Sequence, residues 1–134
     1  MSEAVEIGLA FIRAYNDCFY RRDLAGLRAL YSDQAFTVFW DNHRECDSTT
    51  LDDHLGKVGA FFAHGKATES GAVEPLVIET PRAHLTDASL LITAVLRYHS
   101  APRPGVRSTF CLVDEGGTWK AIHIHHSFDP NEAD

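Results

Sequence analysis

Apolar residues recur along the first third of the chain at the spacing of an α-helix. From Val5 they return at Leu9, Ile12 and Phe19, and neighbouring apolar positions widen the stripe. A stripe this wide predicts a helix that is buried on more than one side.

Two shorter helices and one strand are predicted next. Asp23 and Thr50 are suitable N-caps, because their side-chain oxygens can accept from N–H groups of a first helical turn. The segment 35–40 is rich in aromatic and β-branched residues and predicts a strand. The expected order is a helix over 24–31, a strand over 35–40, a loop over 41–48, a helix over 51–62 closed by Gly65, and a loop over 66–72.

From Val73 onward the apolar period falls to two residues, which is typical of strands joined by hairpins. Pro75 and Pro81 lie in the first of these strands, and a proline cannot donate to a sheet, so this strand is predicted to be an edge strand or bulged. The predicted strands are 73–85, 89–99, 106–114 and 118–128, separated by turns at 86–87 and 115–117 and a longer loop containing Pro102, Pro104 and Gly105.

Helices followed by consecutive hairpin strands are the pattern of an α+β domain. We therefore expect N-terminal helices packed on a strongly curved antiparallel sheet. A single domain over residues 1–128 fits the chain length, and residues 129–134 form an acidic tail that is expected to fray.

The last predicted strand separates by parity into two faces. One face carries Trp119, Ala121, His123, His125 and Ser127, and the other carries Lys120, Ile122, Ile124, His126 and Phe128. A three-residue turn at 115–117 would place Arg107 opposite His125 and Thr109 opposite His123. A turn of a different length would break this register.

This parity predicts both a pocket and an interface. The face with two histidines and an arginine would point at the helices, and a buried polar cluster implies a cavity with partners or water. The opposite face would be an exposed apolar patch, which usually marks an interface, so we predict a homodimer formed sheet to sheet. The predicted interface residues are Phe110, Leu112, Ile122, Ile124 and Phe128.

The candidate residues keep alternative interpretations at this stage. His123 and His125 either contact a pocket ligand, hold the first helix against the sheet as a structural pair, or bind a metal ion with a third ligand. His43, His64, His99 or Asp41 could supply that third ligand in space, but nothing in the sequence shows that they do, so no metal and no cofactor are expected. Arg107 either clamps a carboxylate, pairs with an acidic side chain or lies at a solvated strand end.

Charge and composition narrow the function classes. The formal net charge is −7 and the basic residues are scattered, so no nucleic-acid partner is expected. No apolar run reaches about 18 residues, so no membrane-spanning helix is predicted. Cys18, Cys46 and Cys111 lie far apart and are interpreted as reduced thiols of a cytoplasmic protein.

The run from Trp119 to Ser127 resembles the closing strand of SnoaL-like domains in the nuclear transport factor 2-like superfamily. Its pattern W-x-x-I-H-x-H-x-S is especially similar to the association domain of calcium/calmodulin-dependent protein kinase type II and its bacterial relatives. The resemblance covers residues 4–128. It implies a cone, in which a curved sheet wraps around a long helix and a pocket opens at the wide end, and it implies dimers or larger rings.

The superfamily includes ketosteroid isomerases, polyketide cyclases, dehydratases and non-catalytic assembly modules, so the fold does not settle the function. The isomerases carry a catalytic aspartate on the strand after the second helix and a tyrosine on the first helix. By this resemblance, Tyr15 corresponds to the isomerase tyrosine. The position of the catalytic aspartate falls near Val38 or Phe39, whose side chains cannot accept a proton, and Asp41 would substitute only if the strand end shifted.

We therefore expect a protein that binds a small carboxylate or carbonyl compound, with an assembly module or an isomerase-like, cyclase-like or dehydratase-like enzyme as alternatives. The predicted pocket residues are Tyr15, Trp40, Arg107, Thr109, His123 and His125.

Overall fold

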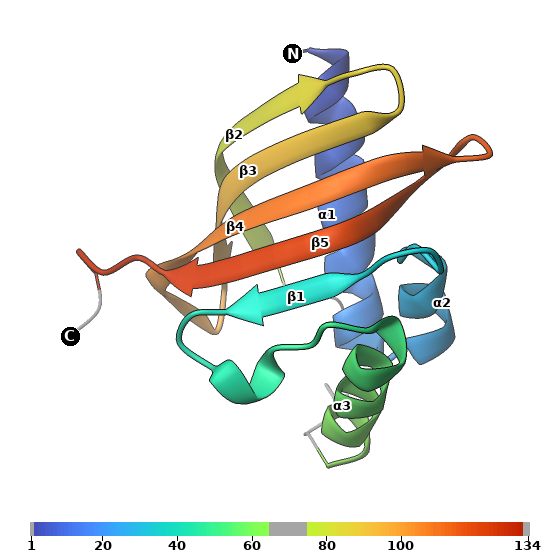
Figure 1. Ribbon diagram of the computed structural model, residues 1–134. Helices are drawn as coiled ribbons and strands as arrows, with labels where there is room; N and C mark the ends of the chain where they lie inside the picture. The colour runs from blue at the N-terminus through green and yellow to red at the C-terminus, as the bar shows by residue number, and fades with distance from the viewer. Residues whose placement is uncertain (1, 65–74, 133–134) are drawn as a thin grey trace.

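A five-stranded sheet wraps around one long helix in the computed structural model (Figure 1), which describes residues 2–64 and 75–132. The helices are α1 (Glu3–Arg21), α2 (Leu24–Ala29) and α3 (Leu51–His64), with a short 3₁₀ turn, η1 (Arg44–Cys46). The strands are β1 (Thr37–Trp40), β2 (Leu76–Leu85), β3 (Ser89–Tyr98), β4 (Ala101–Glu115) and β5 (Thr118–Phe128). The predicted α+β cone is confirmed, while the expected cap at Gly65 and loop over 66–72 lie outside the described residues.

The helix boundaries follow from their caps. The Ser2 side chain accepts from Val5 N at 3.2 Å at the start of α1. The helix ends at Arg22, whose φ of 56° is left-handed. Asp23 accepts from Gly26 N at 2.8 Å and starts α2, and Thr50 accepts from Asp53 N at 3.2 Å before α3. Both predicted N-caps are thus confirmed.

The strand order is β1-β5-β4-β3-β2, and β1 runs parallel to β5 while the other pairs are antiparallel. The expected purely antiparallel sheet is therefore corrected to a mixed one. β2 lies at the sheet edge, and its register shifts between Glu79 and Arg82, around Pro81. This strand is both an edge strand and bulged, as its prolines predict.

The prediction of a loop at Pro102–Gly105 is wrong. β4 already begins at Ala101, which pairs with Tyr98, so β3 and β4 are joined by a tight hairpin. On its other side, β4 is first paired with β5 at Val106. Pro102 and Pro104 therefore lie in the part of β4 that is not paired with β5, so their missing N–H groups cost no hydrogen bond to β5.

The register predicted between β4 and β5 is also wrong, for two reasons. The turn has two residues, Gly116 and Gly117, whose φ angles of 65° and 90° favour glycine. In addition, the pairing shifts between Cys111 and Leu112, so that Ile122 is an extra residue of β5. Arg107 consequently lies opposite Ser127, Thr109 opposite His125 and Cys111 opposite His123.

The bulge at Ile122 lies where β5 changes its edge partner. Before the bulge, Ala121 exchanges backbone hydrogen bonds with Leu30 and Ser32 after α2. After the bulge, β1 takes over as the neighbour of β5, beginning with Thr37 beside His123. One extra residue reverses side-chain parity, so odd-numbered residues face α1 before the bulge and even-numbered ones face it afterwards.

This reversal puts the predicted dimer face inside the molecule. Phe110, Leu112 and Ile124 belong to the buried core, and the Phe110 ring makes edge contacts with Phe11 and Tyr15 of α1. Ile122 and Phe128 are half-buried. The prediction that these five residues form an exposed interface is therefore wrong, because the apolar face of β4 and β5 already covers α1.

Gly8 allows α1 to approach the sheet closely. A Cβ atom there would lie 2.2 Å from Cδ1 and 3.0 Å from Cβ of Ile92, a fully buried residue of β3. The close approach fixes the position of α1 against the sheet. The C-terminal half of this helix carries side chains of the site described below.

The start of the acidic tail is held in place, contrary to expectation. Glu132 accepts from both terminal nitrogens of Arg97 at 2.9 Å and from Gly105 N at 2.8 Å. The Arg97 guanidinium lowers the pKa of Glu132 to about 2. These charge-assisted bonds join the end of the chain to β3 and β4.

Candidate functional site

A cavity of about 810 Å³ lies between the lower half of α1, α3, β1 and the bent ends of β3 and β4. Aromatic and aliphatic side chains form most of its wall. The described residues that line it are Tyr15, Asn16, Phe19, Tyr20, Arg22, Val38, Trp40, Glu45, Cys46, His54, Lys57, Val58, Ala60, Phe61, Tyr98, Ser100, Ala101 and His126. This size and character are typical of a small-molecule site.

A buried hydrogen-bond chain runs from the cavity into the sheet. The Tyr15 hydroxyl lies 3.3 Å from His126 Nε2, and His126 Nδ1 lies 2.7 Å from Ser108 Oγ. The shorter distance suits an O–H donor and the longer one an N–H donor. The Ser108 Oγ also lies 3.4 Å from the Val106 carbonyl, but its contact with Nδ1 is much shorter, so we assign Ser108 as donor to Nδ1. Nε2–H is then the donor to Tyr15, which leaves the Tyr15 O–H to donate into the cavity.

Burial keeps this chain uncharged. It lowers the pKa of His126 to about 3 and raises the pKa of Tyr15 above its ordinary value. The His126 ring also packs between Trp40, at 4.8 Å between centroids, and Phe110, at 5.8 Å. The chain is thus a rigid polar group in an apolar surrounding.

A second polar group reaches the cavity from α3. His54 Nε2 lies 3.2 Å from the hydroxyl of Tyr31, and the His54 ring stacks near Phe36 at 5.0 Å. Burial, with a smaller contribution from Lys57, lowers the pKa of His54 to about 4. This imidazole is therefore also neutral near pH 7.

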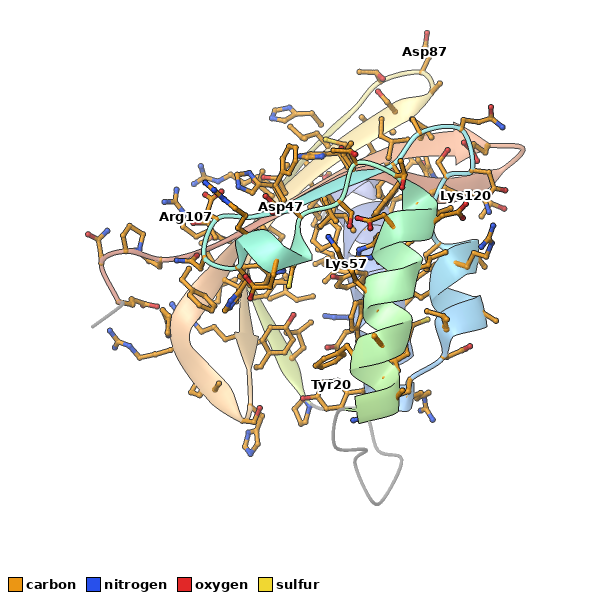
Figure 2. All side chains as sticks on the ribbon, turned by 60° about the horizontal axis from the view of Figure 1, so that its bottom comes forward. Tyr20, Asp47, Lys57, Asp87, Arg107 and Lys120 are labelled. Atoms are coloured by element: carbon orange, nitrogen blue, oxygen red, sulfur yellow. The ribbon has the colours of Figure 1, made fainter. Side chains whose placement is uncertain are left out.

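The charged side chains among the described lining residues contact other groups of the protein. Lys57 of α3 donates to the Asp47 carbonyl, and Figure 2 shows the two residues next to each other. The Lys57 Nζ atom also lies 3.2 Å from the Asp53 carboxylate. Arg22 donates to the Phe62 carbonyl. Glu45 is the one carboxylate among the described lining residues, and its side chain is 75% exposed.

The six predicted pocket residues divide between two faces of the sheet. Tyr15 and Trp40 line the cavity. Arg107, Thr109 and His125 line a second hollow of about 560 Å³, which also contains Arg82, Asp41, Thr80, Thr93, Ala94, Val95, Ser108 and Ser127. This hollow lies on the outer face, which is turned away from α1 and toward the viewer in Figure 1.

The two odd-numbered histidines therefore do not point at the helices, and that prediction is wrong. His123 Nδ1 lies 2.6 Å from Thr37 Oγ1, and its ring contacts Phe39 edge to face. His125 Nε2 lies 2.8 Å from a carboxylate oxygen of Asp41. The inversion follows from the bulge at Ile122, which precedes both histidines.

The described residues place no third metal ligand beside His123 and His125. Across residues 2–64 and 75–132, no group of three or more His, Cys, Asp or Glu side chains is arranged to hold a metal ion. The cysteines Cys18, Cys46 and Cys111 are free thiols.

Sequence reasoning missed the two buried histidines of the cavity. It assigned His126 to the predicted interface face and did not include His54 among the pocket residues. A signal for His54 was present, because it falls on the same face of α3 as Leu51 and Val58, three and four residues away. His126 had no such signal, since its direction depends on the bulge.

Similarity to known proteins supports the fold. No curated protein matches the chain. A nuclear transport factor 2-like protein of unknown function from Pseudomonas putida has a TM-score of 0.69 at 21% identity, covering 99% of this chain and 94% of that one. A putative calcium/calmodulin-dependent protein kinase II association domain from Xanthomonas campestris has a TM-score of 0.69 at 16% identity, covering 91% and 85%.

A putative ketosteroid isomerase from Shewanella frigidimarina has a TM-score of 0.68 at 13% identity, covering 94% of this chain and 96% of that one. No helix in the described parts of the chain has the length and apolar character needed to cross a membrane. The sequence model of the SnoaL-like domain matches residues 9–130, nearly the whole chain, and the protein therefore belongs to the SnoaL-like domain family.

Proposed function

We propose that the protein binds a small, largely apolar and uncharged molecule in the cavity, with a carbonyl oxygen accepting from the Tyr15 hydroxyl. The observation that carries the proposal is the buried chain from Tyr15 through His126 to Ser108 at the wall of an aromatic cavity. A polar chain this deep costs stability unless every member is satisfied, and the Tyr15 O–H is the member that still needs an acceptor.

A carbonyl compound fits better than a carboxylate. The imidazoles of His54 and His126 are neutral near pH 7, and the cations Lys57 and Arg22 are engaged by groups of the protein. A buried carboxylate would find no unpaired positive charge among them, and burying an unpaired charge is costly. An uncharged ligand avoids this cost.

Binding is a better proposal than isomerase chemistry. Val38 and Trp40 of β1 line the cavity at the strand that carries a catalytic aspartate in ketosteroid isomerases, and neither accepts a proton. Asp41, the alternative, lies in the outer hollow and is bonded to His125. The one carboxylate among the described lining residues, Glu45, is 75% exposed, and we therefore assign no catalytic base to the described part of the cavity wall.

The test is a titration with acetophenone, followed by ¹H–¹⁵N NMR of the folded protein. We expect shifts at cavity residues, and the Tyr15→Phe variant is expected to bind about tenfold more weakly because one hydrogen bond is lost. Tyr20→Phe is the matched control, since Tyr20 also lines the cavity but lies outside the buried chain. Equal weakening in both variants, or no binding by the wild-type protein, would contradict the proposal.

We also propose that two copies associate through the outer face of the sheet. Phe39 and Leu91 are 41% and 38% exposed there, and the same face carries both Arg107 and Asp41, so it can complement a copy of itself. Light scattering of the wild-type protein should give a dimer that Phe39→Glu dissociates and Phe61→Glu, on α3, leaves intact. A monomer at micromolar concentration would rule this interface out.

The three free thiols agree with a reducing compartment, and a cytoplasmic location stays a proposal on that ground.

A further inference from the structure

His54 is a buried polar side chain whose second ring nitrogen has no partner among the residues that the structure describes. It is 7% exposed, and its Nε2 contacts the Tyr31 hydroxyl. Its other ring contacts are with the aromatic rings of Tyr31 and Phe36. Among residues 2–64 and 75–132, no group accepts from or donates to His54 Nδ1, although the ring lines the cavity.

The position of the imidazole proton follows from Tyr31. This side chain is fully buried, and His54 Nε2 is the hydrogen-bond partner of its hydroxyl within the described ranges. If Nε2 carried the proton, the Tyr31 O–H would be a buried donor without an acceptor, which is unfavourable. Tyr31 therefore donates to Nε2, and the proton of the neutral imidazole lies on Nδ1.

This assignment leaves Nδ1–H as a second donor for the cavity beside the Tyr15 hydroxyl. We propose that His54 Nδ1–H donates a hydrogen bond to the ligand, so that the site selects uncharged molecules rich in acceptor oxygens and poor in donors: ketones, esters and lactones. The inference rests on the proposed binding function and adds a specificity residue and a ligand class to it.

Charge supports the same class. The pKa of His54 is lowered to about 4 by burial and by Lys57, one turn along α3, while Asp53 opposes this effect weakly. The facing groups of the neighbouring elements include Tyr31 after α2, Phe36 before β1 and the imidazole of His126 on β5, whose pKa is lowered to about 3, so none of them is charged near pH 7. The imidazole therefore stays neutral and can donate from one nitrogen while it accepts at the other.

Two substitutions separate a ligand role from a structural role. In His54→Asn the amide nitrogen can occupy the place of Nδ1 and donate, whereas in His54→Gln the amide oxygen can occupy the place of Nε2 and accept from the Tyr31 hydroxyl. A ligand role predicts that Asn preserves acetophenone affinity within about twofold, while Gln and Phe lower it about tenfold. A structural role predicts the reverse order, because only Gln keeps the contact with Tyr31.

The experiment measures acetophenone affinity by NMR and thermal stability by calorimetry on all three variants. Ethylbenzene, which has the same shape without the oxygen, is the control ligand and should bind all variants equally. We expect Asn above Gln in affinity and Gln above Asn in stability. If affinity follows stability, or if the ketone and the hydrocarbon respond alike, the inference is overturned.

A measurement on the unaltered protein guards against variants that fail to fold. A long-range ¹H–¹⁵N spectrum reports which ring nitrogen of His54 is protonated, and we expect Nδ1. An Nε2-protonated ring would overturn the inference. Loss of acetophenone binding in Tyr15→Phe with full retention in His54→Gln would overturn this inference alone and leave the proposed function standing.

Discussion

The most informative stability prediction concerns Phe110, because the two interpretations of β4 assign it opposite surroundings. In the structure its ring is fully buried and contacts Phe11, Tyr15 and His126 with centroid distances of 5.9, 5.4 and 5.8 Å. On an exposed dimer face it would contribute little to the stability of one chain.

Phe110→Ala removes a buried aromatic ring from this cluster. Such substitutions cost about 3–5 kcal/mol, of which each lost aromatic contact supplies about 0.5–1.5 kcal/mol. Because a domain of this size is stable by about 5–15 kcal/mol, the variant is expected to fold marginally. Phe110→Leu keeps part of the volume and should cost about 1–2 kcal/mol.

Urea unfolding followed by circular dichroism measures these differences, and the control is Val77→Ala on β2. Val77 is 56% exposed, so its truncation should cost less than about 1 kcal/mol. A loss below about 1 kcal/mol for Phe110→Ala, or a loss that disappears when protein concentration is raised, would refute the inward orientation of this residue.

Three further predictions follow from the packing and the charges. Gly8→Ala should destabilise the protein by about 1–3 kcal/mol through overpacking, while Gly56→Ala, in open space on α3, should stabilise it by about 0.5–1 kcal/mol; the same sign for both in urea unfolding would contradict this. Glu132→Gln should lower the melting temperature much more at pH 7 than at pH 2, where about half of the carboxylates are protonated; an equal loss at both would contradict the ion pair. The free energy of unfolding should fall as the pH drops below about 6.5, the ordinary pKa of histidine, toward the lowered pKa values of about 4 for His54 and about 3 for His126. The reason is that the two imidazoles take up protons in the unfolded chain but not in the folded one. A stability that does not change with pH in chemical denaturation would contradict their burial.

The strands and helices could be predicted from local patterns because each pattern has a local cause. Asp23 and Thr50 cap helices, and Pro75 and Pro81 restrict the first hairpin strand, whatever the rest of the chain does. Their interpretation needed no knowledge of distant contacts.

The faces of β5 could not be predicted in the same way. An isoleucine at a bulge carries no sequence signal, and Ile122 is displaced because the edge partner of β5 changes from the segment after α2 to β1. The change depends on contacts about ninety residues apart, such as that between Leu30 and Ala121. One undetected residue therefore moved His126 into the cavity and His125 out of it.

The most direct test of the account is where a bound ketone lies. Intermolecular NOEs from acetophenone to Tyr15, Trp40 and His54 are expected, because these side chains line the cavity between the helices and the sheet. NOEs to Thr109 and His125 in their place would put the ligand in the outer hollow and contradict the account.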